Sequence, residues 1–272
     1  MQKKAGKTFY IGLSIFVFLV MFPFIWVFLT SIKPPGEILN FNWFTTNPNL
    51  DFYVSALETR PLLLYIWNSV AISGLTTIIA IVFASLAAYA VTRLPIRFKG
   101  LILGTVLAAS MFPQIAIISP IYNIITSLGL RNSYTGLVIP YITISLPLAI
   151  WILSTFFQKI PYALEDSAKI DGATPFQTFR KIIFPLAAPG VFTTAILVFI
   201  AAWNEYLFAL TINSQDSMRT VPVGISLYQS QYTVPWGDIT AATVMVTIPI
   251  VIVVLFFQRR IVAGLTSGSV KE

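Results

Sequence analysis

Long apolar runs separated by short polar segments dominate the chain and predict six membrane-spanning helices. About 20 apolar residues suffice to cross a bilayer as a helix, and each run reaches that length. Prolines interrupt the third run at Pro113 and Pro120 and the fourth at Pro140 and Pro147. The spans are expected within residues 8–32, 61–92, 100–130, 132–158, 185–210 and 239–258, with Arg259-Arg260 ending the last. The pattern therefore predicts an all-α polytopic membrane protein.

The longest polar island between apolar runs extends over residues 161–185 and predicts two short helices around a tight turn. Pro161 suits the first position of a helix, where its missing N–H costs nothing, and residues 163–170 can continue that helix. Asp171-Gly172 is expected to end it, because glycine readily adopts the left-handed conformation found just past helix ends.

A second helix is predicted to begin directly after this turn. Thr174 is a favourable N-cap, Pro175 a favourable first helical residue, and Gln177 completes a capping box. Four apolar residues then recur at helical spacing and should share one face; they are Phe176, Phe179, Ile182 and Ile183. An amphipathic hairpin with two aromatic residues on one face is suited to docking on a partner.

Composition excludes several classes of function. The chain is 57% hydrophobic and 10% charged, whereas a soluble domain averages about 25% charged residues. It contains neither cysteine nor histidine, which excludes disulfides, thiolate nucleophiles and histidine-based acid–base or zinc chemistry. It also contains no phosphate-binding Gly-x-x-x-x-Gly-Lys-Ser/Thr sequence. We therefore expect a chain that is neither an enzyme nor its own ATPase, with no metal site.

Positive charge predicts the orientation in the membrane. The net charge of +7 is spread between apolar runs, which favours membrane loops over nucleic-acid binding. Of the 17 Lys and Arg residues, only Lys33, Arg60, Arg131 and Arg219 fall on the side opposite the termini. The positive-inside rule therefore places both termini and the 161–185 segment in the cytoplasm.

These observations give a provisional division of the chain. We expect a cytoplasmic N-terminal tail at residues 1–8, a first transmembrane helix at 9–32 and an extracytoplasmic loop at 33–62. The core transmembrane domain would then occupy residues 63–258, and a cytoplasmic C-terminal tail residues 259–272.

The polar island resembles the cytoplasmic coupling loop, or EAA motif, of ATP-binding cassette (ABC) importer permeases. That motif reads Glu-Ala-Ala, three residues, Gly, nine residues, Ile, one residue, Leu-Pro. Here it reads Asp166-Ser167-Ala168, Gly172, Ile182 and Phe184-Pro185, and every spacing matches. Three residue types differ from the motif: Asp166, Ser167 and Phe184.

The resemblance implies that the hairpin seats in a groove of a separate ATPase. The residues expected to couple the two proteins are Asp166, Ala168, Asp171, Gly172, Ala173, Phe176, Phe179, Ile182 and Pro185. The alternative for Phe176 and Phe179 is that they pack on membrane helices of their own chain.

The C-terminal residues 257–272 resemble the end of carbohydrate-importer permeases of the maltose, trehalose and glycerol-phosphate group. The resemblance covers essentially the whole chain. It implies a six-span type I permease fold with both termini cytoplasmic, located in a bacterial-type inner membrane and surrounded by lipid. The implied partners are a second permease subunit, two cytosolic ATPase subunits that bind ATP and Mg, and an extracytoplasmic sugar-binding protein. No cofactor is expected on this chain, and the implied substrate is a disaccharide such as trehalose or maltose.

Polar residues inside two spans are candidates for the translocation path. A charge at the bilayer centre costs at least about 2.5–3.5 kcal/mol, so Glu205 must face protein, water or the outer interface. Broken helices are tolerated only beside a cavity or another protein segment. The candidates are Gln114, Ser119, Tyr122, Asn123, Asn204 and Glu205. The alternatives are an interfacial helix kink around Glu205 and ordinary interhelical hydrogen bonds in the third span.

Three rival functions follow from the same pattern. An ABC permease for a non-sugar solute, such as an amino acid, phosphate or a peptide, is disfavoured by the C-terminal resemblance. An ion-coupled secondary transporter is expected to have paired charges deep in several spans, and only Glu205 is a candidate. An intramembrane enzyme is disfavoured, because the lack of His and Cys excludes the metalloprotease and Ser-His classes and no paired intramembrane aspartates occur.

Overall fold

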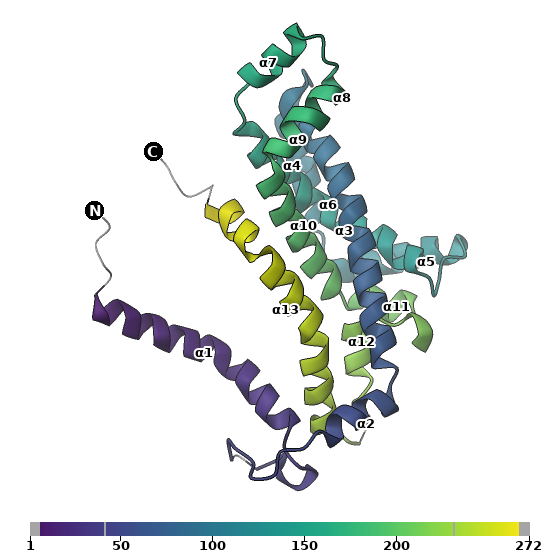
Figure 1. Cartoon of the computed structure of the whole chain (residues 1–272). Helices are drawn as coiled ribbons and strands as arrows, with labels where there is room; N and C mark the ends of the chain where they lie inside the picture. The colour runs from purple at the N-terminus through teal and green to yellow at the C-terminus, as the bar shows by residue number, and fades with distance from the viewer. Residues whose placement is uncertain (1–5, 41, 231, 267–272) are drawn as a thin grey trace. The chain divides into compact units, whose positions relative to one another are not determined.

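The computed structural model of the chain describes residues 6–40, 42–230 and 232–266, with side chains described up to residue 258 (Figure 1). Within these residues every regular element is a helix, so the all-α prediction is confirmed. The expected tails, residues 1–8 and 259–272, lie partly outside the described part of the chain. The helices form two compact units, one of residues 1–63 with 224–248 and one of residues 64–223 with 249–272.

The first unit contains helix α1 (Lys7–Ser31), the short η1 (Pro35–Glu37) and α2 (Asp51–Thr59). It also contains the start of the last helix, α13 (Trp236–Thr266), and the end of α12 (Val221–Ser226). The loop expected at residues 33–62 therefore carries a helix of its own, which the sequence analysis did not predict.

The Phe52 ring of α2 packs directly on Gly237 of α13 within this unit. A Cβ atom on Gly237 would lie 2.3 Å from that ring, so a larger residue would force the ring to move. Two hydrogen bonds fix the same region: Tyr228 donates to the Ala56 carbonyl at 2.6 Å, and Arg60 to the Leu227 carbonyl at 2.9 Å.

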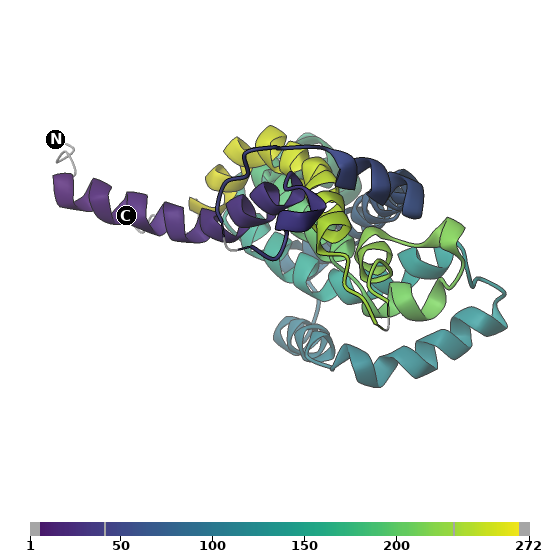
Figure 2. The same cartoon turned by 90° about the horizontal axis from the view of Figure 1, so that it is seen from below.

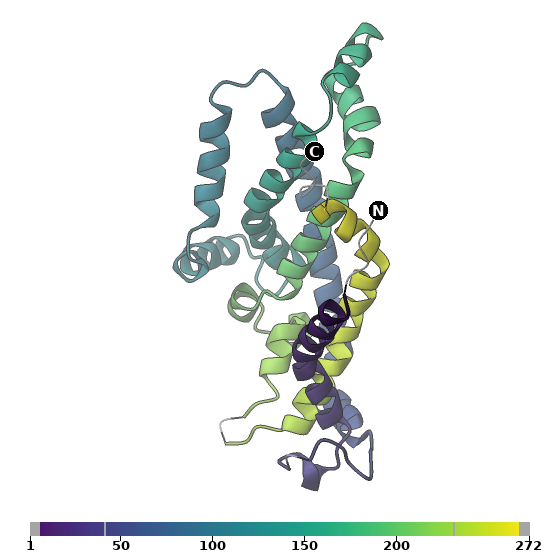
Figure 3. The same ribbon diagram turned by 90° about the vertical axis from the view of Figure 1, so that its left-hand side faces the viewer.

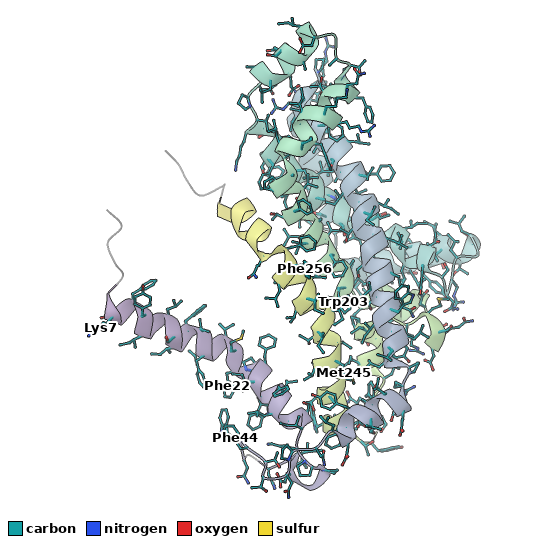
Figure 4. All side chains as sticks on the ribbon, in the orientation of Figure 1. Lys7, Phe22, Phe44, Trp203, Met245 and Phe256 are labelled. Atoms are coloured by element: carbon teal, nitrogen blue, oxygen red, sulfur yellow. The ribbon has the colours of Figure 1, made fainter. Side chains whose placement is uncertain are left out.

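Helix α1 exposes its apolar side chains all round. None of its most apolar window is buried, and Figure 4 shows its side chains, Phe22 among them, projecting away from the helix. A helix that is apolar on every face suits a lipid environment or an apolar partner.

The second unit is built on three long helices, α3 (Leu62–Arg93), α6 (Tyr134–Gln158) and α10 (Ala188–Trp203). Small residues on α3, such as Ala84 and Ala88, are fully buried and allow close helix approach. The core lies near one end of these helices and includes residues of the 161–185 hairpin. Its members are Ala80, Ile81, Ala84, Ala88, Tyr89, Ala149, Leu153, Phe157, Phe179, Ile183, Ala187, Val191 and Val198.

Two of the six predicted spans are bent. Helices α4 (Lys99–Ser110) and α5 (Gln114–Ser127) meet at 90°, as Figures 2 and 3 show. The break falls at Pro113, which is the N-cap of α5. Proline disfavours helical geometry in the residue before it, which explains the stop at this point.

The predicted fifth span meets the hairpin at a bend and is broken near its other end. The hairpin segment Pro175–Leu186 turns by 79° into α10, and α11 (Leu207–Ile212) restarts the helix after a gap at residues 204–206. Four described helices are long and apolar enough to cross a membrane, and the number is six if each of the two bent pairs forms one span.

The last helix extends beyond the predicted sixth span. Its helical backbone continues to Thr266, whereas the candidate membrane span within it runs from Trp236 to Gln258.

Candidate functional site

The predicted hairpin is present and adjoins the core of the second unit (Figure 1). It consists of α7 (Ala163–Ile170), α8 (Pro175–Thr178), the π-helical turn η2 (Phe179–Ile183) and α9 (Phe184–Leu186). Helix α7 begins two residues later than expected: Pro161 lies before the helix and Tyr162 is the N-cap.

The turn between the two arms forms as the sequence predicts. Gly172 adopts φ +78°, the left-handed conformation that favours glycine. The Gln177 N–H donates to Thr174 Oγ1 at 3.3 Å, and the Thr174 N–H donates to Gln177 Oε1 at 2.8 Å. This reciprocal capping box fixes the start of α8.

A groove of about 710 Å³ lies between the arms of the hairpin. Five of the nine predicted coupling residues line it: Ala168, Asp171, Gly172, Ala173 and Ile182. Leu164, Ser167, Gln177 and Lys181 complete the lining. The other four predicted residues are Asp166 and Pro185, which are exposed, and the aromatic pair.

The two aromatic rings lie beside each other, with their centroids 6.3 Å apart, but they differ in burial. Phe176 is 60% exposed, whereas Phe179 is 8% exposed and lies in the core. The π-helical turn begins at Phe179, and its i→i+5 bonding changes the angular spacing of the residues that follow, Ile182 and Ile183. For Phe179 the structure supports the alternative of packing on its own membrane helices, while Phe176 and Pro185 remain available to a partner.

Arg93, the last residue of α3, forms an enclosed junction with the hairpin that sequence reasoning missed. Its Nη1 lies 3.1 Å from Glu165 Oε1, and the Arg93 and Glu165 side chains are 0% and 5% exposed. This is an ion pair and not an aligned hydrogen bond, since neither atom forms a hydrogen bond of good geometry with a described residue. Two features could have found it: the basic residue ending an uncharged run, and an acidic residue beside Asp166.

Additional contacts surround the Arg93 guanidinium. Its Nη2 donates to the carbonyl of Phe157 and, at 2.6 Å, to that of Ile160. The guanidinium also lies 4.3 Å from the centre of the Tyr162 ring. One side chain therefore contacts the end of α6, the segment entering α7, and α7 itself.

Asp166 points to the outside of α7. It pairs with Lys169 at 2.9 Å, and the Asp166 side chain is 64% exposed. The hydrogen bond from Lys169 to Asp166 raises the pKa of the Lys169 ammonium above its ordinary value. An exposed pair of this kind contributes little stability, so Asp166 is free to form a different contact.

Two of the six predicted path residues meet at a small cavity. Gln114 and Glu205 line a space of about 50 Å³ together with Tyr141 and Ser145. Glu205 also caps the interrupted fifth span: its Oε1 accepts from the Phe208 N–H at 2.9 Å, and its Oε2 from the Ala209 N–H at 3.1 Å.

The remaining path candidates do not converge on this cavity. Ser119 and Asn123 are exposed on α5. The Tyr122 ring lies 5.1 Å from the Arg131 guanidinium, and Asn204 donates to the Ile200 carbonyl at 2.9 Å. Across the described residues no group of three His, Cys, Asp or Glu side chains is placed to hold a metal ion.

Solved structures with a similar fold are ABC transporters. A bacterial ABC transporter involved in the import of the acidic polysaccharide alginate is 21% identical, with a TM-score of 0.79 over 95% of this chain and 98% of that one. The MetNI methionine ABC transporter is 16% identical, with a TM-score of 0.60 over 75% of this chain and 95% of that one. At these identities the likeness establishes the fold.

Characterised relatives are more similar in sequence. The trehalose transport system permease protein SugB of Mycobacterium tuberculosis is 46% identical over 92% of each chain. The sulfoquinovosyl glycerol transport system permease protein SmoH of Agrobacterium fabrum is 42% identical over 98% of this chain and 95% of its own length. The trehalose/maltose transport system permease protein MalG of Thermococcus litoralis is 42% identical, covering 96% of this chain and 95% of that one.

The family match covers most of the chain, including the core helices and the hairpin. Residues 80–267 match the family described as "Binding-protein-dependent transport system inner membrane component". The chain therefore belongs to this family of ABC-importer permeases, which sit in the bacterial inner membrane.

Proposed function

We propose that this permease translocates a carbohydrate, specifically a disaccharide such as trehalose or maltose, and is driven by a separate ATPase through the 161–185 hairpin. The observation that carries the proposal is the hairpin itself. It combines a preformed turn, an open groove and two exposed side chains, Asp166 and Phe176, with a firm attachment to the core through Phe179. The substrate class is supported by the three relatives, which are transport permeases for sulfoquinovosyl glycerol, trehalose and trehalose/maltose.

The hairpin would be the contact through which movement of the ATPase reaches the membrane helices. An ATPase closing on ATP and Mg would displace the groove-lining arms, and the buried Phe179 would carry that motion into α3, α6 and α10. A close-packed core transmits displacement because its side chains cannot rearrange independently. The sugar would cross unchanged, so this chain performs no chemistry.

The proposed assembly follows from the orientation of the chain. Both termini and the hairpin would lie in the cytoplasm, as the distribution of Lys and Arg favours. A second permease subunit, two ATPase subunits and an extracytoplasmic sugar-binding protein would complete the importer. The exposed apolar surface of α1 suits contact with lipid or the second permease.

Gln114 and Glu205 are proposed to border the path where the third and fifth spans are broken. Their shared cavity with Tyr141 and Ser145 offers amide, hydroxyl and carboxylate groups. Such groups suit the hydroxyl-rich surface of a sugar.

The function is tested by uptake into cells from which the gene has been deleted and then restored. We expect the deletion to abolish uptake of radiolabelled trehalose or maltose, with uptake recovered by the restored gene. Uptake should survive a protonophore while cellular ATP is maintained, and should stop when ATP is depleted. Uptake that stops with the protonophore at constant ATP would contradict ATP-driven import and favour an ion-coupled transporter. Undiminished uptake of both sugars in the deletion, with loss of methionine uptake, would contradict the substrate class.

A further inference from the structure

We propose that Arg93 is a positioning residue for energy coupling: it fixes the outer arm of the hairpin, α7, to the ends of α3 and α6, so that both spans move with it. The inference rests on the proposed function, because a coupling role requires that an ATPase moves the hairpin. It assigns a role to a side chain that lies 72 positions before Glu165 and outside the coupling motif.

The two arms of the hairpin are attached to the core in different ways. The second arm is held by apolar packing, with the Phe179 ring 5.2 Å from the Tyr89 ring and 6.4 Å from the Phe157 ring. Helix α7 has only two buried residues, Glu165 and Ala168. Since an alanine methyl group adds little contact area, Glu165 is the main side-chain attachment of α7.

Arg93 is suited to join several elements because the guanidinium is a planar group with donors on separate edges. The Arg93 Nη1 pairs with Glu165, and Nη2 donates to the carbonyls of Phe157 and Ile160. The guanidinium lies over the Tyr162 ring. A lysine ammonium in this place could not make the same set of contacts. The carbonyls that accept from Arg93 belong to the last turn of α6 and to the residues just after that helix, where helix carbonyls lack internal partners.

Because it is buried, the Arg93–Glu165 ion pair should stay formed throughout the transport cycle. With both side chains enclosed, opening the pair would leave a charge buried and unpaired, which is strongly unfavourable. The neighbouring Asp166–Lys169 pair is exposed and can open at little cost. Adjacent acidic residues on α7 therefore have opposite roles: Asp166 faces outward to a partner, and Glu165 faces inward to the junction.

Arg93 lies at the end of α3, so a movement of α7 acts on the end of that helix. Arg93 is the last residue of α3, a helix of 32 residues that is about 48 Å long at 1.5 Å per residue. A displacement of α7 is thus delivered to the tip of a long helix that crosses the membrane, and at the same point to the end of α6.

The test compares Glu165→Gln and Arg93→Lys with wild type in the complete importer, reconstituted with its permease partner, ATPases and binding protein. The measured quantity is the amount of trehalose or maltose imported per ATP hydrolysed, normalised to assembled complex. We expect ATP hydrolysis to continue while this ratio falls at least about fivefold, the lower end of typical coupling effects. Glu165→Asp, which keeps the charge, should recover part of the ratio.

Matched controls change the same atoms at exposed positions: Glu58→Gln and Arg97→Lys. Both should keep the wild-type ratio. The proposal is overturned if Glu165→Gln and Arg93→Lys also keep the wild-type ratio, or if import and hydrolysis fall together with the amount of complex, since that would make the junction a folding element only. Failure of the wild-type importer to move either sugar would count against the proposed function and not against the junction.

Discussion

The ring of Phe179 lies 5.2 Å from the ring of Tyr89, so the hairpin is joined to α3 by aromatic packing three residues after an exposed phenylalanine. Phe176 and Phe179 therefore provide a matched pair on one short segment. One side chain is available to a partner, and the other is part of the core that the partner would move.

Replacing each phenylalanine by alanine should separate docking from stability. Phe179→Ala should lower the free energy of unfolding by about 3–5 kcal/mol, because it leaves a cavity in a packed core. Phe176→Ala should lower it by only about 0.5–1.5 kcal/mol, because this exposed ring loses its contact with Phe179 but leaves no cavity in the core. Thermal unfolding of the purified chain measures this difference.

Co-purification with the ATPase tests the docking half of the same prediction. Phe176→Ala should reduce the recovered ATPase although the chain remains folded. If Phe176→Ala retains the ATPase fully, the exposed ring is not part of the docking surface.

Glycine should be required at position 172 because of the backbone conformation there, and not because a side chain would clash with a neighbour. A Cβ atom at this position would meet nothing within 4 Å, but the residue adopts φ +78°. The left-handed conformation costs other residues roughly 1–2 kcal/mol, and asparagine tolerates it best. We expect Gly172→Val to abolish sugar uptake with normal membrane insertion, and Gly172→Asn to retain much of the uptake. Equal loss in both variants would instead indicate that a partner approaches the Gly172 backbone closely.

The parts of the site that the sequence predicted are local. The left-handed Gly172 and the capping box between Thr174 and Gln177 depend on residues within three positions of one another. The four straight candidate spans were predictable for a similar reason, since each is a continuous apolar run. The break near Pro113 was also visible, because proline acts on its own neighbours.

The parts that the sequence did not predict depend on distant contacts. The burial of Phe179 follows from Tyr89 and Phe157, which lie on other helices. The Arg93–Glu165 pair joins residues far apart in sequence, and no periodicity within α3 or α7 reveals it. The 90° angle between α4 and α5 was likewise not predictable, because a proline allows a helix to break but does not determine the angle of the break.

Glu205 should contribute to stability through the helix break that it caps. Glu205→Ala would leave the Phe208 and Ala209 amides without this acceptor, and the Tyr141 hydroxyl would lose its 2.6 Å partner. An unsatisfied buried group costs about 1–3 kcal/mol, so the melting temperature should fall clearly. Tyr141→Phe removes one of the three bonds and should have a smaller effect.

A path role for Glu205 requires a separate measurement. Glu205→Gln keeps one acceptor oxygen but replaces the other with an NH2 donor, so it should lose one of the two amide bonds and lower stability less than Glu205→Ala does. A change in the KM of uptake that exceeds that of Tyr141→Phe would support contact with the sugar. An unchanged KM would leave Glu205 as a structural cap alone.

The orientation of the hairpin can be tested with single cysteines, because the natural chain contains none. Ser167 lines the hairpin groove and is exposed, and Ser217 is exposed in the loop expected on the opposite face. A membrane-impermeant maleimide should label Ser217→Cys in intact spheroplasts and Ser167→Cys only in inverted membrane vesicles. Ser154 is 2% exposed, so Ser154→Cys should remain unlabelled in both until the protein is denatured.

The same labelling also reports on contact with the ATPase. If the groove receives an ATPase surface, adding the assembled ATPase to inverted vesicles should slow the labelling of Ser167→Cys and leave Ser217→Cys unaffected. Labelling of Ser167→Cys in intact spheroplasts would place the hairpin outside the cell. A cytosolic ATPase could not reach it there, so that single result would contradict the proposed direction of coupling and the role of Arg93 that depends on it.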